Sequence, residues 1–190
     1  MPDGSGTPSA TALDRLRSET APGLAALDAC PAMRRLVRPD TQGIVDLLLR
    51  LHRHHAAHET GIHRTLAPVL PGGLLAPRRK LPRLDRDLAG LVLTPPPVQR
   101  ALPPHDVPTA AGWLYAHEAL TLSHLSLHRR LRTVAPGLRL RHLAGYGSDT
   151  AIRWAETRRI VGTLLTDPDA EDAAVAGAAA ALDALAAALD

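Results

Sequence analysis

Apolar residues recur along this chain every three or four positions, which is the spacing of helices with one buried face. The first such stretch predicts a helix over residues 12–27, which Pro22 and Gly23 are expected to interrupt. A long helix is predicted next, from Asp40 as its N-cap to Ile62. Both helices alternate apolar and charged side chains, so each is expected to pack with one face inward.

The second half of the chain continues the helical pattern after a proline-rich stretch at 94–108, which is expected to be a surface connection. Helices are predicted at 81–88, 107–132, 148–165 and 169–189, the last with Asp169 as its cap. No segment shows a convincing strand pattern. Six or seven helices without a strand predict an all-α fold.

Composition agrees with one helical domain. A chain of 190 residues with 45% apolar residues can bury one sizeable core, and its 2% aromatic content leaves Leu, Ala and Val to fill it. The polar Gly/Ser/Pro tract at 1–11 lacks the pattern of a signal peptide and is expected to be a disordered tail. The domain is therefore expected to span 12–190 and to be cytoplasmic.

The 22 basic residues give a formal net charge of +3, and nearly all of them are arginines. The basic run Arg78 to Arg86 lacks interleaved aromatics, so a nucleic-acid partner is not expected. The sequence contains no run of 18 consecutive apolar residues, so no membrane span is expected. The single cysteine, Cys30, is interpreted as a small core residue.

Four short stretches occur in the order found in bacterial heme oxygenases. They are Leu16 to Thr20 with Leu27-Asp28, the long helix with Glu59, Gly112 to Glu118, and Gly145-Tyr146-Gly147 followed by Trp154. In this order and spacing, the chain resembles the biliverdin-producing heme oxygenase family. The resemblance implies a single-domain, heme-oxygenase-like helical bundle.

The resemblance also implies a heme site between the first helix and the helix at 107–132. The family's reaction is oxidative cleavage of heme to biliverdin, iron and carbon monoxide, with electrons from an external donor. The family's iron-ligating histidine position falls on Leu24, which has no lone pair for iron. The family's glycine positions over the heme correspond to Ala119, Ser123 and His124, the candidate catalytic positions here.

At other positions of the family motifs, this chain has the residue types that the family has. Arg17 and Tyr115 match residues that lie near a heme propionate in the family, and Thr20 belongs to the same motif as Arg17. Arg158 follows Trp154 by one turn, and a guanidinium there could pair with a carboxylate. These residues, together with Leu24 and His124, are the candidate binding residues for heme or another tetrapyrrole.

Two responses to the missing axial histidine are open at this point. His117, His124 and His128 recur at spacings of seven and four, so His124 is a candidate iron ligand from the opposite side. Alternatively, the chain is a non-catalytic binding or regulatory protein on the same fold. The histidines at 52–58 are interpreted as a surface run.

A non-heme reading is a further alternative. Glu59 and His63 have the four-residue spacing that lets two side chains share a metal ion. Glu118 and His124 would complete a carboxylate and imidazole set suited to iron or manganese. The corresponding hypothesis is a di-metal oxidase of the heme-oxygenase-like fold.

Overall fold

The computed structural model describes residues 10–35, 41–95 and 97–190, which form α-helices, short 3₁₀ turns and connecting loops, with no strand among them. The predicted all-α, single-domain fold is confirmed. The helices are α1 (Ala10–Asp28), α2 (Pro31–Arg35), α3 (Thr41–Leu66), α4 (Leu81–Gly90), α5 (Val107–Val134), α6 (Thr150–Leu164) and α7 (Pro168–Leu189). The 3₁₀ turns are η1 (Ala76–Arg78) and η2 (Gly147–Asp149).

The expected break in the first helix does not occur. Helix α1 runs without interruption through Pro22 and Gly23. Gly23 packs closely on α7, where a Cβ added to it would lie 2.8 Å from Leu182 Cδ1. Tertiary packing of this kind overrides the local preference against proline, which costs one backbone hydrogen bond.

Three other boundaries differ from the pattern. Helix α3 ends at Leu66, one turn later than predicted, while its expected cap, Asp40, lies outside the described residues. Helix α7 is capped by Asp167 rather than by Asp169, because the Asp167 carboxylate accepts the Ala170 N–H at 2.8 Å. The short α2 was not predicted, since five residues carry too little periodicity to detect.

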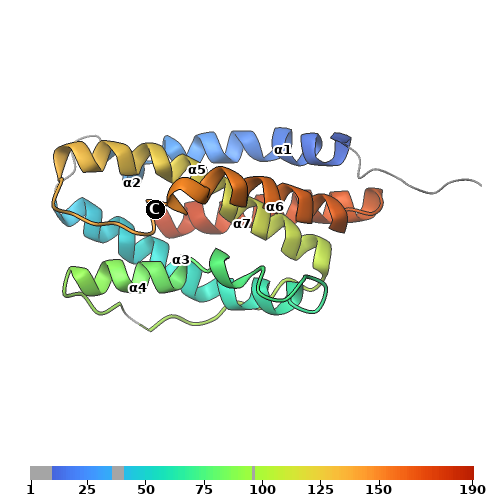
Figure 1. Cartoon of the computed structure of the whole chain (residues 1–190), viewed down its shortest axis with the longest axis horizontal. Helices are drawn as coiled ribbons and strands as arrows, with labels where there is room; N and C mark the ends of the chain where they lie inside the picture. Colours follow the sequence, from blue (N-terminus) through green and yellow to red (C-terminus); the bar gives the residue numbers. More distant parts are fainter. Residues whose placement is uncertain (1–9, 36–40, 96) are drawn as a thin grey trace, which may run out of the picture.

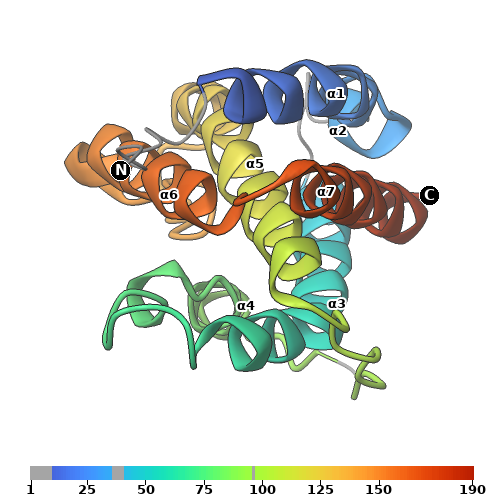
Figure 2. The same ribbon diagram turned by 90° about the vertical axis from the view of Figure 1, so that its right-hand side faces the viewer.

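Helix α5 runs through the centre of the bundle, with α1 on one side of it and α3 on the other (Figures 1 and 2). Helix α7 lies against α5 in direct backbone contact: a Cβ on Gly112 would collide with the Ala174 carbonyl, and one on Gly177 with the Thr109 carbonyl. By length and composition alone α7 could cross a membrane. Its buried positions instead form part of the same hydrophobic core as α1, α3 and α5.

Candidate functional site

Helix α5 presents two chemically different faces. Tyr115 and Ser123 lie on the side facing α1, where Thr20 acts on the pKa of Tyr115 and Ser123 on that of Asp28. Ala119 lies between them at the same four-residue spacing, so these three positions form one stripe, named here the α1 face.

The opposite side of α5, named here the α3 face, carries histidines. His117 Nε2 lies 2.9 Å from Nε2 of His54 on α3. The His124 ring lies 5.4 Å from the ring of His142, in the loop after α5. Residues 123 and 124 are adjacent in sequence but about 100° apart around the helix, so Ser123 and His124 belong to different faces.

The α1 face brings the predicted carboxylate-binding residues together. Burial raises the pKa of Tyr115, and the charges of Arg158 and Arg17 act in the opposite direction on the same hydroxyl. The Trp154 ring packs 5.1 Å from the Tyr115 ring. Arg17 and Arg158 are themselves exposed, and Arg17 Nη2 lies 3.2 Å from Asp14 Oδ1, so two exposed guanidiniums from α1 and α6 act by charge on a buried phenol.

The iron-ligand positions do not come together on this face. Leu24 is half-buried against the hydrophobic core and offers no donor atom. His124 is buried on the α3 face, beside His142. Helix α1 contains no histidine, so the structure brings no imidazole to the α1 face from the described part of α1 or α5.

The histidines of α3 are not a surface run, contrary to the prediction. His52, His54 and His55 are all buried. They lie on the same inward side of the helix as Leu47, Leu48 and Leu51. A continuous row of rings, with centroids 4.7 to 5.5 Å apart, runs through the core in the order Trp113, His58, His54, His117, His55, His142 and His124.

Burial keeps these imidazoles neutral. It lowers the pKa of His54 to about 3 and that of His124 to about 4, in both cases as the largest effect. The pKa values of His55 and His117 are lowered well below the usual value by burial first and by neighbouring imidazoles second. Neutral imidazoles retain a lone pair, which is the form that binds metal ions.

Several ring nitrogens of this row, and one of the neighbouring His52, have no hydrogen-bond partner among the described residues. They are Nδ1 of His52, His54 and His55, and both ring nitrogens of His142. Buried polar atoms are normally paired, so a group of unpaired ones requires a physical explanation.

The predicted non-heme ligands, Glu59 and Glu118, are engaged by protein donors. Glu59 Oε2 accepts the backbone N–H groups of Lys80 at 2.5 Å and Leu81 at 3.1 Å. The buried Lys80 ammonium donates to Glu118 Oε1 at 2.7 Å, and the Tyr146 hydroxyl donates to the same oxygen at 2.6 Å. A cation of the protein therefore already pairs with Glu118, while Glu59 is held by backbone donors.

Lys80 is a functional candidate that the motif analysis missed. It is the only lysine in the sequence, whereas every other basic side chain outside the histidines is arginine. Its ammonium also donates to Thr121 Oγ1 at 2.9 Å and to the Tyr146 hydroxyl at 2.7 Å. The sequence signal that could have revealed it is that Lys80 is the one lysine among 22 lysine and arginine residues.

The loop at 141–147 is held in place by buried contacts from α4 and α5. The Asp87 carboxylate accepts the backbone N–H groups of Arg141 and His142, each at 2.8 Å. Gly145 has a φ of 59°, a left-handed conformation that favours glycine, and turns the chain so that Tyr146 reaches Glu118. These contacts position His142 beside the histidines of the α3 face.

Comparison with solved structures finds a heme oxygenase from Neisseria meningitidis, whose crystal structures contain bound NO and CO. The match covers 95% of this chain and 91% of that chain, with a TM-score of 0.76 and 21% sequence identity. No protein-family model matches this chain, and no curated protein does. The chain therefore has the heme-oxygenase-like fold.

Proposed function

We propose that this protein binds a tetrapyrrole through its carboxylates on the α1 face of α5, without a histidine bond to the metal. The observation that carries the proposal is that the charges of Arg17 and Arg158 both act on the buried Tyr115 hydroxyl. Two guanidiniums and a phenol suit carboxylates such as propionates, because arginine pairs with them through two parallel hydrogen bonds. The fold of the Neisseria heme oxygenase supports the choice of ligand class.

The residues present fit the edge of such a ligand but not an iron at its centre. Position 24 carries leucine, and His124 lies on the other side of α5 beside His142. Ala119 and Ser123 add side chains where the resemblance places glycine. We therefore favour the non-catalytic alternative over oxidative heme cleavage, and we assign no electron donor or oxygen chemistry to this site.

The engagement of Glu59 and Glu118 weighs against the di-metal alternative. A metal ion between the two carboxylates would lie close to the Lys80 ammonium, which already donates to Glu118 at 2.7 Å. Like charges at such a distance in a buried site repel strongly. The proposed ligand is accordingly a tetrapyrrole rather than a pair of iron or manganese ions.

The test is a parallel titration with hemin and with metal-free protoporphyrin IX, followed by fluorescence quenching and absorbance. Both ligands are expected to bind with similar affinity. Replacing Arg158 by alanine should weaken both about tenfold, the scale of one charge-assisted hydrogen bond. Arg159→Ala is the matched control, since Arg159 is the next residue on α6 and is also exposed.

Three results would contradict the proposal. The first is binding of hemin without binding of protoporphyrin, which would mean that the iron is ligated. The second is equal weakening by Arg158→Ala and Arg159→Ala, which would indicate a general charge effect. The third is no binding of either ligand to the wild-type protein.

A further inference from the structure

The row of histidines on the α3 face contains a group that the tetrapyrrole proposal does not use. His54, His55 and His117 are each buried and each offer a ring nitrogen, and these nitrogens all lie within 4.8 Å of one another. We propose that these three histidines form a buried site for a transition-metal ion that prefers imidazole ligands, with Zn²⁺ as the expected ion.

The distances are close to those of a metal site. Zinc binds imidazole nitrogen at about 2.0–2.1 Å in a tetrahedron, which places ligand nitrogens roughly 3.3 Å apart. His54 Nε2 and His117 Nε2 lie 2.9 Å apart and need to separate slightly, while the third nitrogen needs to approach. Rotations of the side chains alone can make such adjustments.

The ring nitrogens that remain unpaired argue for a missing ligand. Nδ1 of His55 is buried without a hydrogen-bond partner in the described structure, and the nearby Glu59 Oε2 is 4.0 Å away. The Ala184 carbonyl of α7 interacts with His54, yet Nδ1 of His54 still lacks a partner with hydrogen-bond geometry there. His54 is held through Nε2 by the contact with His117, so the unpaired nitrogens are Nδ1 of His54 and Nδ1 of His55.

The contact between His54 and His117 is also compatible with a metal ion between the two rings. Each neutral imidazole carries one proton, so two Nε2 atoms at 2.9 Å share at most one hydrogen bond. Loss of that proton is not required for metal binding, because a neutral ring binds through its bare nitrogen and keeps its proton on the other. One of the two rings needs only to change tautomer.

The surrounding charges tolerate a cation. The ionisable groups around the cluster are Lys80, Glu59, Glu118, His58, His63 and His142. Lys80 opposes the formal charges of the two carboxylates, and burial keeps His58, His63 and His142 neutral. Lys80 lowers the pKa values of His55 and His117 and so opposes a positive charge there. The Glu59 carboxylate, with Oε2 4.0 Å from His55 Nδ1, acts in the opposite direction and partly offsets this effect.

The ligand set determines the class of ion. Imidazole suits Zn²⁺, copper, nickel and iron, whereas the absence of a thiolate or a free carboxylate from the three-residue set disfavours softer and harder ions. A site with three protein ligands leaves a fourth position for water. This site lies on the α3 face of α5, opposite the proposed tetrapyrrole site on the α1 face. The experiments on the two sites are therefore independent of each other.

The experiment uses full-length protein stripped with a chelator and then loaded with Zn²⁺, both as native protein and during refolding. After desalting, metal analysis should find one zinc per chain, and Co²⁺ in its place should give the visible absorption of a tetrahedral ion. His54→Gln and His117→Gln should each lower zinc affinity at least about hundredfold, measured by competition with a chromophoric chelator.

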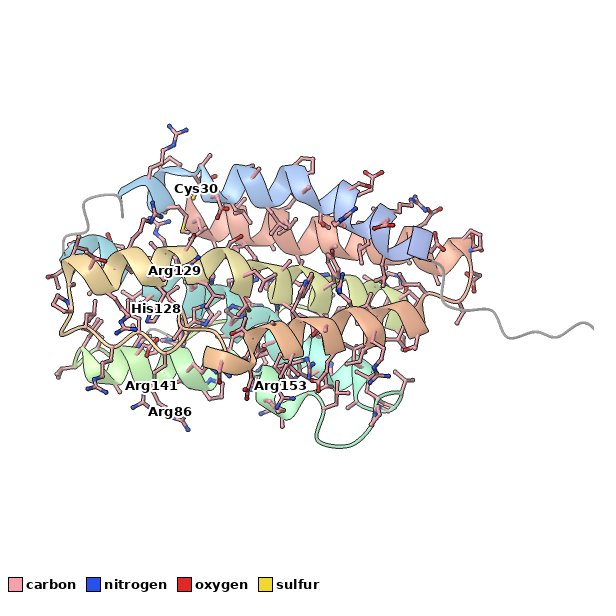
Figure 3. All side chains as sticks on the ribbon, turned by 45° about the horizontal axis from the view of Figure 1, so that its top comes forward. Cys30, Arg86, His128, Arg129, Arg141 and Arg153 are labelled. Atoms are coloured by element: carbon pink, nitrogen blue, oxygen red, sulfur yellow. The ribbon has the colours of Figure 1, made fainter. Side chains whose placement is uncertain are left out.

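The matched control is His128→Gln, because His128 lies on the same helix nearer its C-terminal end and outside the cluster (Figure 3). It should retain wild-type zinc affinity. Circular dichroism checks that each variant keeps its helix content. Zinc should raise the thermal midpoint of the wild type and of His128→Gln but not that of His117→Gln.

The proposal is overturned if the wild type retains less than about a tenth of a zinc ion per chain by both loading routes. Unchanged affinity in His117→Gln also overturns it, because the ion would then be held elsewhere. If a glutamine variant fails to fold, X-ray absorption of the zinc-loaded wild type decides: a first shell of imidazole nitrogens supports the proposal, and a shell dominated by oxygen refutes it.

Discussion

The two faces of α5 differ in charge and in exposure. The α1 face carries charge at its rim, with exposed Arg17 and Arg158 over the buried Tyr115. The α3 face has the reverse arrangement, in which neutral imidazoles line the core beside a sealed ion pair between Lys80 and Glu118. An exposed, cationic rim can exchange a large anionic ligand, whereas a closed, neutral cluster can hold only something as small as an ion.

The largest effect is expected at the ion pair of the α3 face. Lys80→Met removes the buried ammonium and leaves the Glu118 carboxylate with the Tyr146 hydroxyl as its remaining partner. Breaking a buried pair from one side usually costs about 3–5 kcal/mol, because the other charge stays desolvated. Urea denaturation at pH 7 measures the change in the free energy of unfolding.

Two companion variants make this result specific. Arg79→Met, at the exposed neighbouring position, should change stability by less than about 0.5 kcal/mol. Adding Glu118→Gln to Lys80→Met should recover part of the loss, since it removes the stranded charge. Additive losses in the double variant would show that the two side chains are not coupled.

The next effect is a dependence of stability on pH that arises from the buried histidines. Burial lowers the pKa of His63 and of His124 to about 4, while an unfolded histidine titrates near pH 6.5. Between these values the unfolded chain binds more protons, so the stability present above pH 6.5 is lost as pH falls. Each such histidine contributes about 1.4 kcal/mol per pH unit in this window.

Urea midpoints of metal-free protein at pH 7, 6 and 5 measure this slope. Burial raises the pKa values of Glu59 and Asp87, which acts in the opposite sense, so the informative quantity is a difference between variants. His124→Gln should reduce the slope by about the contribution of one histidine. His105→Gln, at an exposed position, should leave it unchanged, and equal slopes for all three proteins would contradict the prediction.

The sequence predicted the bundle well because its helices are long and their apolar spacing is regular. It also singled out Tyr115 together with Arg17, Thr20 and Arg158, which act together on the Tyr115 hydroxyl and whose role in binding stays a prediction. These residues come from three helices, and only the resemblance to a family, not periodicity, could have indicated that they meet. Proline at 22 misled the analysis because packing of Gly23 on Leu182 is not visible in a local window.

The chemistry of the α3 face was not predictable in the same way. A run of histidines in α3 is polar by composition, and nothing in the sequence says that His54 and His55 turn inward to meet His117. The role of Lys80 likewise depends on contacts across 38 residues to Glu118. A polar residue can be assigned to the core only when its hydrogen-bond partners are known. When those partners are distant in sequence, only the three-dimensional structure identifies them.

The smallest effect, and the sharpest contrast between the faces, concerns the iron of bound hemin. Leu24→His places an imidazole on α1 at the position where the resemblance to heme oxygenases places the iron ligand. It should tighten hemin binding about tenfold and give the absorption band of a histidine-ligated heme. It should not tighten the binding of protoporphyrin, which has no iron. His124→Ala should change neither affinity nor spectrum, because His124 faces His142 rather than α1. Absorbance titrations of the two variants against the wild type measure both. A spectral change in His124→Ala would mean that the iron is reached from the α3 face, and an unchanged spectrum in Leu24→His would mean that hemin does not lie beside α1.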